Sequence, residues 1–479
     1  MSTTAPAIDV PAQPETSLPP LNERVSFGVG FGLLGGALTT LGLLLLFWAQ
    51  MAGVMVALFL TPILLVASWP AFARQARREH DDKLAQLLLL AVALKLLGAV
   101  VRYWVAYHIY DGRIDAGEYH MVGTQLAMQF RAGDFHTNLD SLSGTNFISF
   151  FTGLLYTITG PSIYAGFLLF SWMAFWGMFL MYRAFVIVVP DGNKRSYARL
   201  LFFLPSMLYW PSSIGKEAWM LFTLGLVAFG LARMLTTRAW RGLVIAATGL
   251  WLGTLVRPHV AGMAALGLVV PYLLARPPRR LGALGPVVKL LASIVLLVGA
   301  VMLLGKTESY LREKGIEPQD GVNAVLAESG RRTGTGGSGF QVDVRGPSLS
   351  NLPVATVTIL FRPFLFEAHN AQAGVTALES TVLLCLAISR RRAIWRAIRH
   401  PRRRPYVAFI VIYSVLFVFA FSTIANFGIL ARERTQLLPF FLVLLAMPAS
   451  RRAPAQRAVA YGSPTLDGRA DADRQLART

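Results

Sequence analysis

The sequence predicts an all-α, polytopic integral membrane protein with roughly twelve transmembrane helices and with surface helices on the outer face. Hydrophobic residues make up 54% of its 479 residues, charged residues only 15%, and its mean hydropathy is +0.52. A typical soluble domain carries about 25% charged residues. The apolar runs are about 20 residues long and do not alternate with polar residues, which favours membrane-spanning helices over a β-barrel.

These runs define a transmembrane domain, residues 26–449, between two polar tails, 1–25 and 450–479, which we expect to be disordered and cytoplasmic. The first tail has no basic stretch before an apolar core, so a cleaved signal peptide is not expected. Pro205, Pro211 and Pro258 flank short runs, where broken helices are expected. The expected spans are 26–48, 52–70, 86–108, 163–186, 198–212, 215–234, 241–256, 258–275, 284–305, 372–389, 406–425 and 428–448.

The positive residues predict the orientation. Lys and Arg lie in short loops between apolar runs, and the densest group extends from Arg390 to Arg404. Such loops are enriched on the cytoplasmic side, so we expect a multi-pass protein of the cytoplasmic (inner) membrane with both termini inside. Two long segments, 109–162 and 306–371, then lie outside. The net charge of +20 is explained by this topology, and nucleic acid is not expected as a partner.

Several kinds of site are disfavoured by the sequence. The single cysteine, Cys385, excludes an intrachain disulfide and a cysteine metal site. The spacing of His108, His120 and His136 fits no standard metal site. The tract RRTGTGGSGF is a flexible loop rather than a P-loop, because no Gly-Lys-Ser/Thr follows it. No definite cofactor is indicated, and a divalent cation is left open.

A polar stretch between two apolar runs, Asp111 to Phe135, carries the first candidate site. Its carboxylates are Asp111, Asp115 and Glu118, and a short amphipathic pattern follows them. A polar segment that begins at a helix end and then lies flat on a bilayer suits chemistry on a lipid-borne substrate. A carboxylate there could accept a proton from an acceptor hydroxyl as a general base. We rank Asp115 first, because two small residues follow it, then Glu118, and then Asp111, which lies closest to the helix end.

Four further polar clusters are expected at the same outer face, where ionisable residues in a membrane protein tend to mark function. Arginine presents a planar fork of donors that matches phosphate oxygens, so these clusters predict a cavity for a lipid-linked phosphate or pyrophosphate. Other interpretations remain: a charged pair at a helix start, arginines that snorkel to head groups, and a histidine packed in a turn. The candidate substrate-binding residues are Lys216, Glu217, Arg257, His259, Arg362, Glu367, His369, Asn370, Asn426, Arg432 and Arg434.

This layout resembles the GT-C superfamily of membrane glycosyltransferases, which use polyprenyl-phosphate sugars. The resemblance lies in DAGEYHMVGTQLAMQFRAGDF, in the surface segment FISFFTGLLYTITGPSIYAGFLLF, and in FFLPSMLYWPSSIGKEAWMLF, within residues 86–275. It implies an acidic catalytic residue in the first outer loop, with Asp115 or Asp111 as the base. The loop has no Asp-x-Asp pair and two spans precede the one that leads into it, so the resemblance does not fix a metal requirement.

The expected function is therefore a glycosyltransferase of cell-envelope polysaccharide assembly, acting at the outer face. Its partners would be a polyprenyl-linked sugar donor, a glycan or lipid-linked acceptor, and membrane lipids. A repeat-unit polymerase of the Wzy type, similar in its outer arginines, is one alternative. A lipid-linked oligosaccharide flippase or transporter is the other. Polar residues spread through the bilayer depth would favour a transporter, whereas in the sequence they gather at one face. The sugar, acceptor, linkage and oligomeric state are left open.

Overall fold

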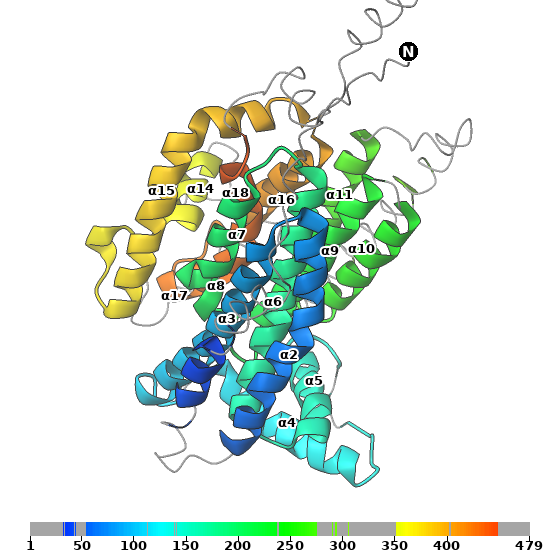
Figure 1. Cartoon of the computed structure of the whole chain (residues 1–479), viewed down its shortest axis with the longest axis vertical. Helices are drawn as coiled ribbons and strands as arrows, with labels where there is room; N and C mark the ends of the chain where they lie inside the picture. Colours follow the sequence, from blue (N-terminus) through cyan, green and yellow to red (C-terminus); the bar gives the residue numbers. More distant parts are fainter. Residues whose placement is uncertain are drawn as a thin grey trace, which may run out of the picture. The chain divides into compact units, whose positions relative to one another are not determined.

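The computed structural model describes residues 32, 34–42, 44, 54–112, 114–137, 139, 141–236, 239–274, 290, 293, 294, 305, 351–401 and 404–448. Throughout this part of the chain the regular elements are helices, as Figure 1 shows, and no strand is present. The two polar tails, parts of the expected spans 26–48 and 284–305, and residues 306–350 of the second outer loop lie outside the described residues. The predicted all-α class is confirmed for the described part.

The α-helices are α2 (Val54–Glu79), α3 (Asp82–His108), α4 (Asp115–Arg131), α5 (Gly144–Thr159), α6 (Ile163–Val188), α7 (Lys194–Phe203), α8 (Pro205–Tyr209), α9 (Lys216–Met234), α10 (Ala239–Thr254), α11 (Pro258–Leu274), α14 (Leu352–Phe361), α15 (Ala371–Ile398), α16 (Pro405–Phe421), α17 (Phe427–Glu433) and α18 (Leu438–Leu445). Two short 3-10 helices, η4 (Leu365–Glu367) and η6 (Arg434–Gln436), also lie in the described part of the chain.

The protein is membrane-embedded. Five helices, α2, α3, α6, α9 and α15, are long and apolar enough to cross a membrane. Helices α10, α11 and α16, which occupy three other expected spans, contain 16, 17 and 17 residues. They are therefore only about 24–26 Å long, against roughly 30 Å for the hydrocarbon core. The total of twelve spans is not reached by the length criterion in the described part and stays a prediction.

Two of the expected single spans are broken. The expected span 198–212 is divided into α7 and α8 at Leu204, which is extended with φ −65° and ψ 127°. The cause is Pro205, which lacks a backbone N–H and disfavours helical geometry in the residue before it. The expected span 428–448 is divided into α17, η6 and α18. The break before Pro205 agrees with the broken helices expected at the proline-flanked runs, whereas the prediction of one continuous helix over 428–448 was wrong.

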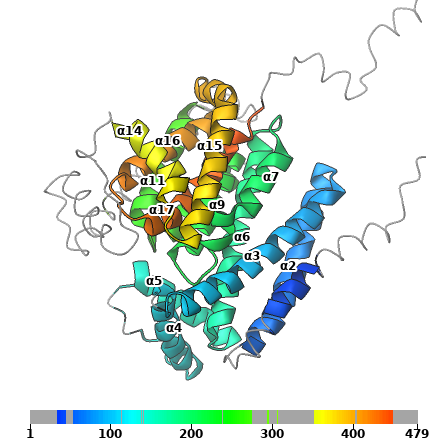
Figure 2. The ribbon, with the colours of Figure 1, turned by 90° about the vertical axis from the view of Figure 1, so that its left-hand side faces the viewer.

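The chain divides into two compact units. Unit 1 comprises residues 1–175 and 208–218, and unit 2 comprises residues 176–207 and 219–479. In unit 1, α2 and α3 lie side by side, as Figures 1 and 2 both show. The ring of Phe72 meets that of Phe175 at 5.6 Å, and the Trp172 indole N–H donates to Ser68 Oγ at 2.9 Å. Unit 1 thus has its own packed aromatic core.

Unit 2 is a separate cluster of helices in which α11 packs against α10 and α16, and α15 packs against α14 and α18. Glycines let the backbones approach closely. A Cβ added at Gly230 would lie 2.5 Å from the backbone N of Ala246, and one at Gly249 would lie 2.8 Å from the carbonyl O of Thr223. Small residues at helix contacts are typical of membrane proteins, where close backbone packing drives association.

Candidate functional site

The first candidate site begins at the turn that ends α3. Asp111 and Gly112 have φ angles of 50° and 71°, so the chain reverses through the left-handed region. Gly112 suits this turn because its φ is positive, and an added Cβ would also lie tightly, 3.0 Å from the ring of Tyr107. The turn places α4 directly after the long apolar α3.

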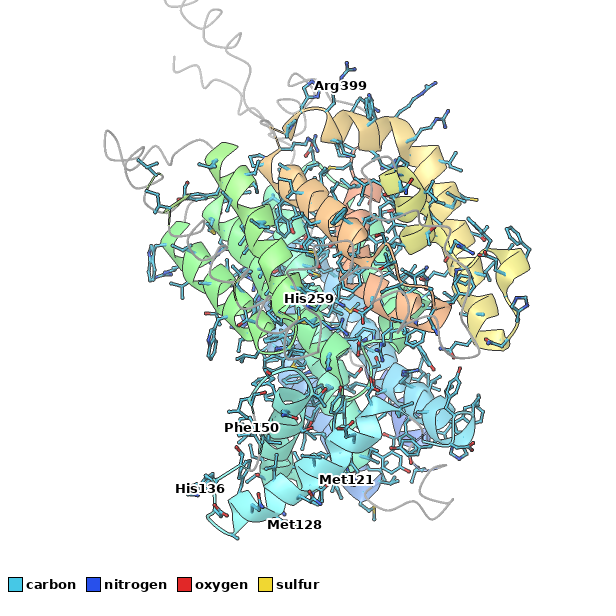
Figure 3. All side chains as sticks on the ribbon, turned by 180° about the vertical axis from the view of Figure 1, so that it is seen from behind. Met121, Met128, His136, Phe150, His259 and Arg399 are labelled. Carbon is cyan, nitrogen blue, oxygen red and sulfur yellow. The ribbon has the colours of Figure 1, made fainter. Side chains whose placement is uncertain are left out.

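Helix α4 is amphipathic, as the sequence predicted. Its side toward the protein buries Ala116, Tyr119, Gly123, Leu126, Ala127 and Phe130. Asp115 and Glu118 are exposed in its first turn, three residues apart and therefore neighbours on the helix surface. Met121 and Met128, also on α4, are labelled in Figure 3 and are exposed. Carboxylates at a helix N-terminus also stabilise the helix through its dipole, by about 0.3–1 kcal/mol, which is a structural role for them.

Helix α5 supports α4 through close packing. A Cβ at Gly123 would lie 2.9 Å from Thr152 Cβ, and one at Gly153 would lie 2.8 Å from Leu126 Cβ. Arg131 adds two hydrogen bonds, from Nε to the Thr157 carbonyl at 3.0 Å and from Nη2 to the Tyr156 carbonyl at 3.0 Å. Both carbonyls lie in the last turn of α5, and that of Tyr156 also accepts from the Gly160 N–H at 2.9 Å. The tightly packed pair of helices α4 and α5, here called the platform, therefore holds the helix that carries the two carboxylates.

His120 links this platform to a group of tyrosines. Its Nδ1 lies 2.9 Å from the hydroxyl of Tyr156, which is fully buried. Burial lowers the pKa of His120 below its usual 6.5, so its ring is neutral near pH 7. Nearby in the fold, Tyr103 stacks on Tyr107 and receives a 3.0 Å hydrogen bond from the Tyr164 hydroxyl. The His120 ring is therefore neutral and is held in place by the Tyr156 hydroxyl, two positions after Glu118 in the sequence.

Lys216 and Glu217 begin α9, after a buried non-helical turn from Pro211 to Gly215. The Lys216 ammonium donates to Thr145 Oγ1, near the start of α5, at 3.0 Å. Glu217 is buried in the first turn of α9. Irregular backbone inside a membrane protein is tolerated where protein buries it or where it lines a cavity. The structure therefore attaches Lys216 to the same unit as Asp115, through the α5 helix.

Two cations of unit 1 were missed by the sequence interpretation. Lys95 is fully buried in the middle of α3, and Arg102 is almost as deeply buried near its C-terminal end. The Arg102 guanidinium lies 4.6 Å from the Tyr209 ring centroid and 4.8 Å from that of Trp210, and Nη1 donates to the Tyr209 hydroxyl at 2.8 Å. Their signal was present in the sequence, because both are cations within the apolar run 86–108.

The second candidate site, in unit 2, is built from arginine–glutamate pairs. Arg257, immediately before α11, is buried and makes a bidentate pair with Glu433 at the end of α17. The Arg257 Nη2–Glu433 Oε1 distance is 2.7 Å, and the Gln436 amide donates to Glu433 Oε2, also at 2.7 Å. A carboxylate with three donors is satisfied in the protein interior. Arg257 is therefore engaged with Glu433 rather than open to solvent.

Arg434 is 0% exposed and pairs with Glu379 of α15 at 3.1 Å. It also donates to Ser380 Oγ at 2.9 Å and to the Arg362 carbonyl at 3.2 Å. The other oxygen of Glu379 accepts the backbone N–H of Ser206 at 2.6 Å, at the start of α8. Glu379 therefore satisfies a backbone donor at the break before α8 and neutralises Arg434. The sequence interpretation missed Glu379, the one carboxylate inside the apolar α15.

Arg362, after α14, pairs with Glu367 of η4. The Arg362 Nε lies 2.9 Å from Glu367 Oε1, and the Phe364 N–H donates to Oε2 at 2.8 Å. Partial burial alone would raise the pKa of Glu367, but these hydrogen bonds outweigh it and hold the pKa below its usual value. The pair is only partly buried, with 21% of the Arg362 side chain exposed. It closes a local loop between α14 and α15.

The remaining candidates have local roles. Asn370 and Asn426 are N-caps: their side-chain oxygens accept from Ala373 N at 2.8 Å and from Gly428 N at 2.9 Å. The ring of His259, labelled in Figure 3, lies 6.0 Å from that of Phe421. His369 is exposed, and Arg432 has 30% of its side chain exposed beside Glu433. The expected cationic cavity is therefore, in unit 2, largely a set of charge pairs and caps.

Among the described residues, no group of three His, Cys, Asp or Glu side chains could hold a metal ion. The divalent cation left open by the sequence therefore has no assembled ligand set in this part of the chain. Comparison of the chain with family models, with curated proteins and with solved structures gave no match.

Proposed function

We propose that this protein is a membrane glycosyltransferase that uses a polyprenyl-phosphate-linked donor, in the manner of the GT-C enzymes that its sequence resembles. One observation carries the proposal. Two exposed carboxylates, Asp115 and Glu118, stand in the first turn of a surface helix that follows directly on the long apolar α3. A lipid-linked substrate places its sugar at this level, just outside the hydrocarbon core.

The proposed reaction is an inverting displacement. The oxygen of an acceptor hydroxyl attacks the anomeric carbon of the donor, and its proton passes to the Asp115 carboxylate. The bond from the anomeric carbon to the phosphate oxygen breaks, and the phosphate leaves with the bonding electrons. A base of this kind contributes typically about 10²–10⁴ in rate. Lys216, held by Thr145, is the cation of the same unit that we assign to the leaving phosphate.

The test uses purified protein in lipid and a labelled polyprenyl-phosphate sugar, with release of polyprenyl phosphate as the readout. Asp115→Asn keeps the shape of the side chain but cannot accept the proton, so turnover is expected to fall by about 10²–10⁴ while donor binding persists. Glu118→Gln and Asp111→Asn test the second and third choices. Asp134→Asn is the matched control, because Asp134 is an exposed acid of the same loop bonded to His136 at 3.1 Å.

If Asp115→Asn turns over normally while Glu118→Gln or Asp111→Asn does not, the site stands but the base is reassigned. Full activity in all three variants removes this loop from the chemistry. Growth of long products from lipid-linked repeat units would instead identify a polymerase of the Wzy type.

We further propose that α4 faces the outer side of the cytoplasmic membrane, because the arginine-rich loops are expected inside. A single cysteine placed by Glu118→Cys in a Cys385→Ser background tests this orientation. An impermeant thiol reagent is expected to label it only from the outside. Labelling from the cytoplasmic side alone would reverse the proposed topology.

A transporter of lipid-linked oligosaccharide is the second candidate, and a specific observation favours it. Lys95 and Glu379 lie buried within the long apolar helices α3 and α15, so polar residues do not gather at one face as the sequence suggested. Ionisable residues inside membrane helices often mark transport pathways. Movement of intact labelled donor across a liposome membrane, with no release of polyprenyl phosphate, would support the transporter and overturn the transferase.

A further inference from the structure

Helix α15 is longer than a membrane crossing requires. It contains 28 residues, and the stretch from Ala371 to Ser389 already covers about 28 Å at about 1.5 Å per residue. The hydrocarbon core is roughly 30 Å thick. The last nine residues, Arg390 to Ile398, therefore extend about 13 Å further, through the depth of a head-group layer.

One exposed face of α15 changes its chemistry along the helix. Leu378, Cys385 and Ile388 are exposed on this face. Arg392, Trp395 and Arg399 continue the same face at helical spacing and are exposed as well. Figure 3 labels Arg399 at the C-terminal end of this helix. The change from aliphatic to cationic and aromatic side chains takes place within one turn.

The opposite face of the same segment is fixed to unit 2. Ala393 and Ala397 are buried, and Arg390 donates from Nε to the Leu445 carbonyl at 3.1 Å and from Nη2 to the Met447 carbonyl at 2.5 Å. Arg390 thus satisfies carbonyls at the end of α18. The exposed arginines are consequently presented on a helix whose rotation is fixed by packing.

We propose that the exposed face formed by Arg391, Arg392, Trp395 and Arg399, here called the basic stripe, binds the phosphate head groups of anionic membrane lipids. Residues 390–404 contain eight arginines and no acidic residue, so the charge suits an anionic surface. Trp395 is 62% exposed, and tryptophan is enriched at the level of the head groups. This binding is independent of the proposed transferase activity.

The basic stripe continues an apolar face of the same helix, which favours a lipid leaflet over nucleic acid or an acidic protein. A nucleic acid or an acidic protein would match the arginines but would not explain Leu378 and Ile388 on the same exposed face. A bilayer leaflet offers hydrocarbon and then phosphate, in that order, within the length of this helix. Juxtamembrane arginines each contribute about 1 kcal/mol to attraction by an anionic leaflet, or roughly fivefold in affinity.

The test uses Trp395 as a local reporter in full-length protein embedded in phosphatidylcholine nanodiscs. A fixed fraction of the lipid carries brominated chains, either as phosphatidylglycerol or as phosphatidylcholine, and the difference from Trp395→Phe isolates one of the ten tryptophans. Stronger quenching by the anionic lipid is expected. The preference should fall at least about fivefold in the triple variant Arg391→Gln, Arg392→Gln, Arg399→Gln, and should weaken in roughly 1 M salt.

The matched control is the triple variant Arg74→Gln, Arg77→Gln, Arg78→Gln, which removes three exposed arginines from the end of α2 and should leave the Trp395 preference unchanged. Equal quenching by the two lipids in the unmodified protein, or no quenching by either, would overturn the proposal. A Trp395 signal that responds to duplex DNA but not to lipid identity would assign the basic stripe to nucleic acid and also overturn it.

Discussion

The two units use carboxylates in opposite ways. In unit 1, Asp115 and Glu118 stand exposed at the start of α4, on the platform that α4 and α5 form. In unit 2, Glu379 and Glu433 are buried and each is bonded to an arginine. A buried ion pair incurs a large desolvation cost that its mutual attraction only partly offsets, so it specifies an arrangement more than it stabilises one. An exposed carboxylate avoids this desolvation cost and can be reached from solvent. The comparison therefore predicts large effects on stability in unit 2 and effects on activity in unit 1.

The largest expected effect comes from breaking the Arg434–Glu379 pair. Glu379→Gln leaves the Arg434 charge buried without compensation, which typically costs about 3–5 kcal/mol. The double variant Glu379→Gln, Arg434→Met removes both charges and should recover most of that loss. Denaturant unfolding in detergent measures both free energies. If the single variant is as stable as the unmodified protein, the pair does not hold unit 2 together.

A smaller effect is expected at the contact between α4 and α5. The Cβ of Gly153→Ala would lie 2.8 Å from Leu126 Cβ, so the helices must separate, at a cost of about 1–3 kcal/mol. Gly374→Ala in α15 is the control, because no heavy atom lies within 4 Å of its added Cβ, and it should be neutral or stabilising. Thermal unfolding of the two variants distinguishes the steric effect of the added Cβ from the general effect of replacing a helical glycine. Equal midpoints would show that the platform is loosely packed.

The pH dependence of His120 gives a still smaller signal. Because its pKa in the folded protein lies below the usual 6.5, the unfolded chain binds more protons in the window between the two values. The stabilising contribution is therefore complete above pH 6.5 and is lost as the pH falls through the folded pKa. His120→Gln should remove this part of the pH profile. NMR of labelled histidine checks the pKa directly, and titration at or above 6.5 would contradict the buried environment.

The smallest effect on stability is expected from Asp115→Asn. Asp115 is exposed in the first turn of α4, so loss of its charge should lower the free energy of unfolding by no more than about 1 kcal/mol. Its melting temperature should fall only slightly, whereas turnover is expected to fall sharply. A clear loss of stability would indicate that Asp115 has a structural role, as the carboxylates of unit 2 do.

The sequence predicted the helical class, the amphipathic helix α4 and the break near Pro205, because length, periodicity and proline chemistry are local properties. It did not predict how charges pair. Arg257 and Glu433 are bonded across 176 positions of sequence, and Arg434 meets Glu379 across 55. Such pairings depend on which helices become neighbours, and nothing in the local pattern encodes that. Lys95 and Glu379 could have been flagged as single charges in apolar runs, but their partners could not.

The division of residues 428–448 into α17, η6 and α18 has a consequence for biosynthesis. Helices α17 and α18 contain seven and eight residues, so each is only about 10–12 Å long and neither can serve as an independent membrane insertion signal. Charged residues at the centre of an inserting helix cost about 2.5–3.5 kcal/mol each at the translocon, and Glu433 and Arg434 lie at the division between these helices. Their partners, Arg257 and Glu379, are synthesised earlier. We therefore expect this segment to enter the bilayer only against helices already in place.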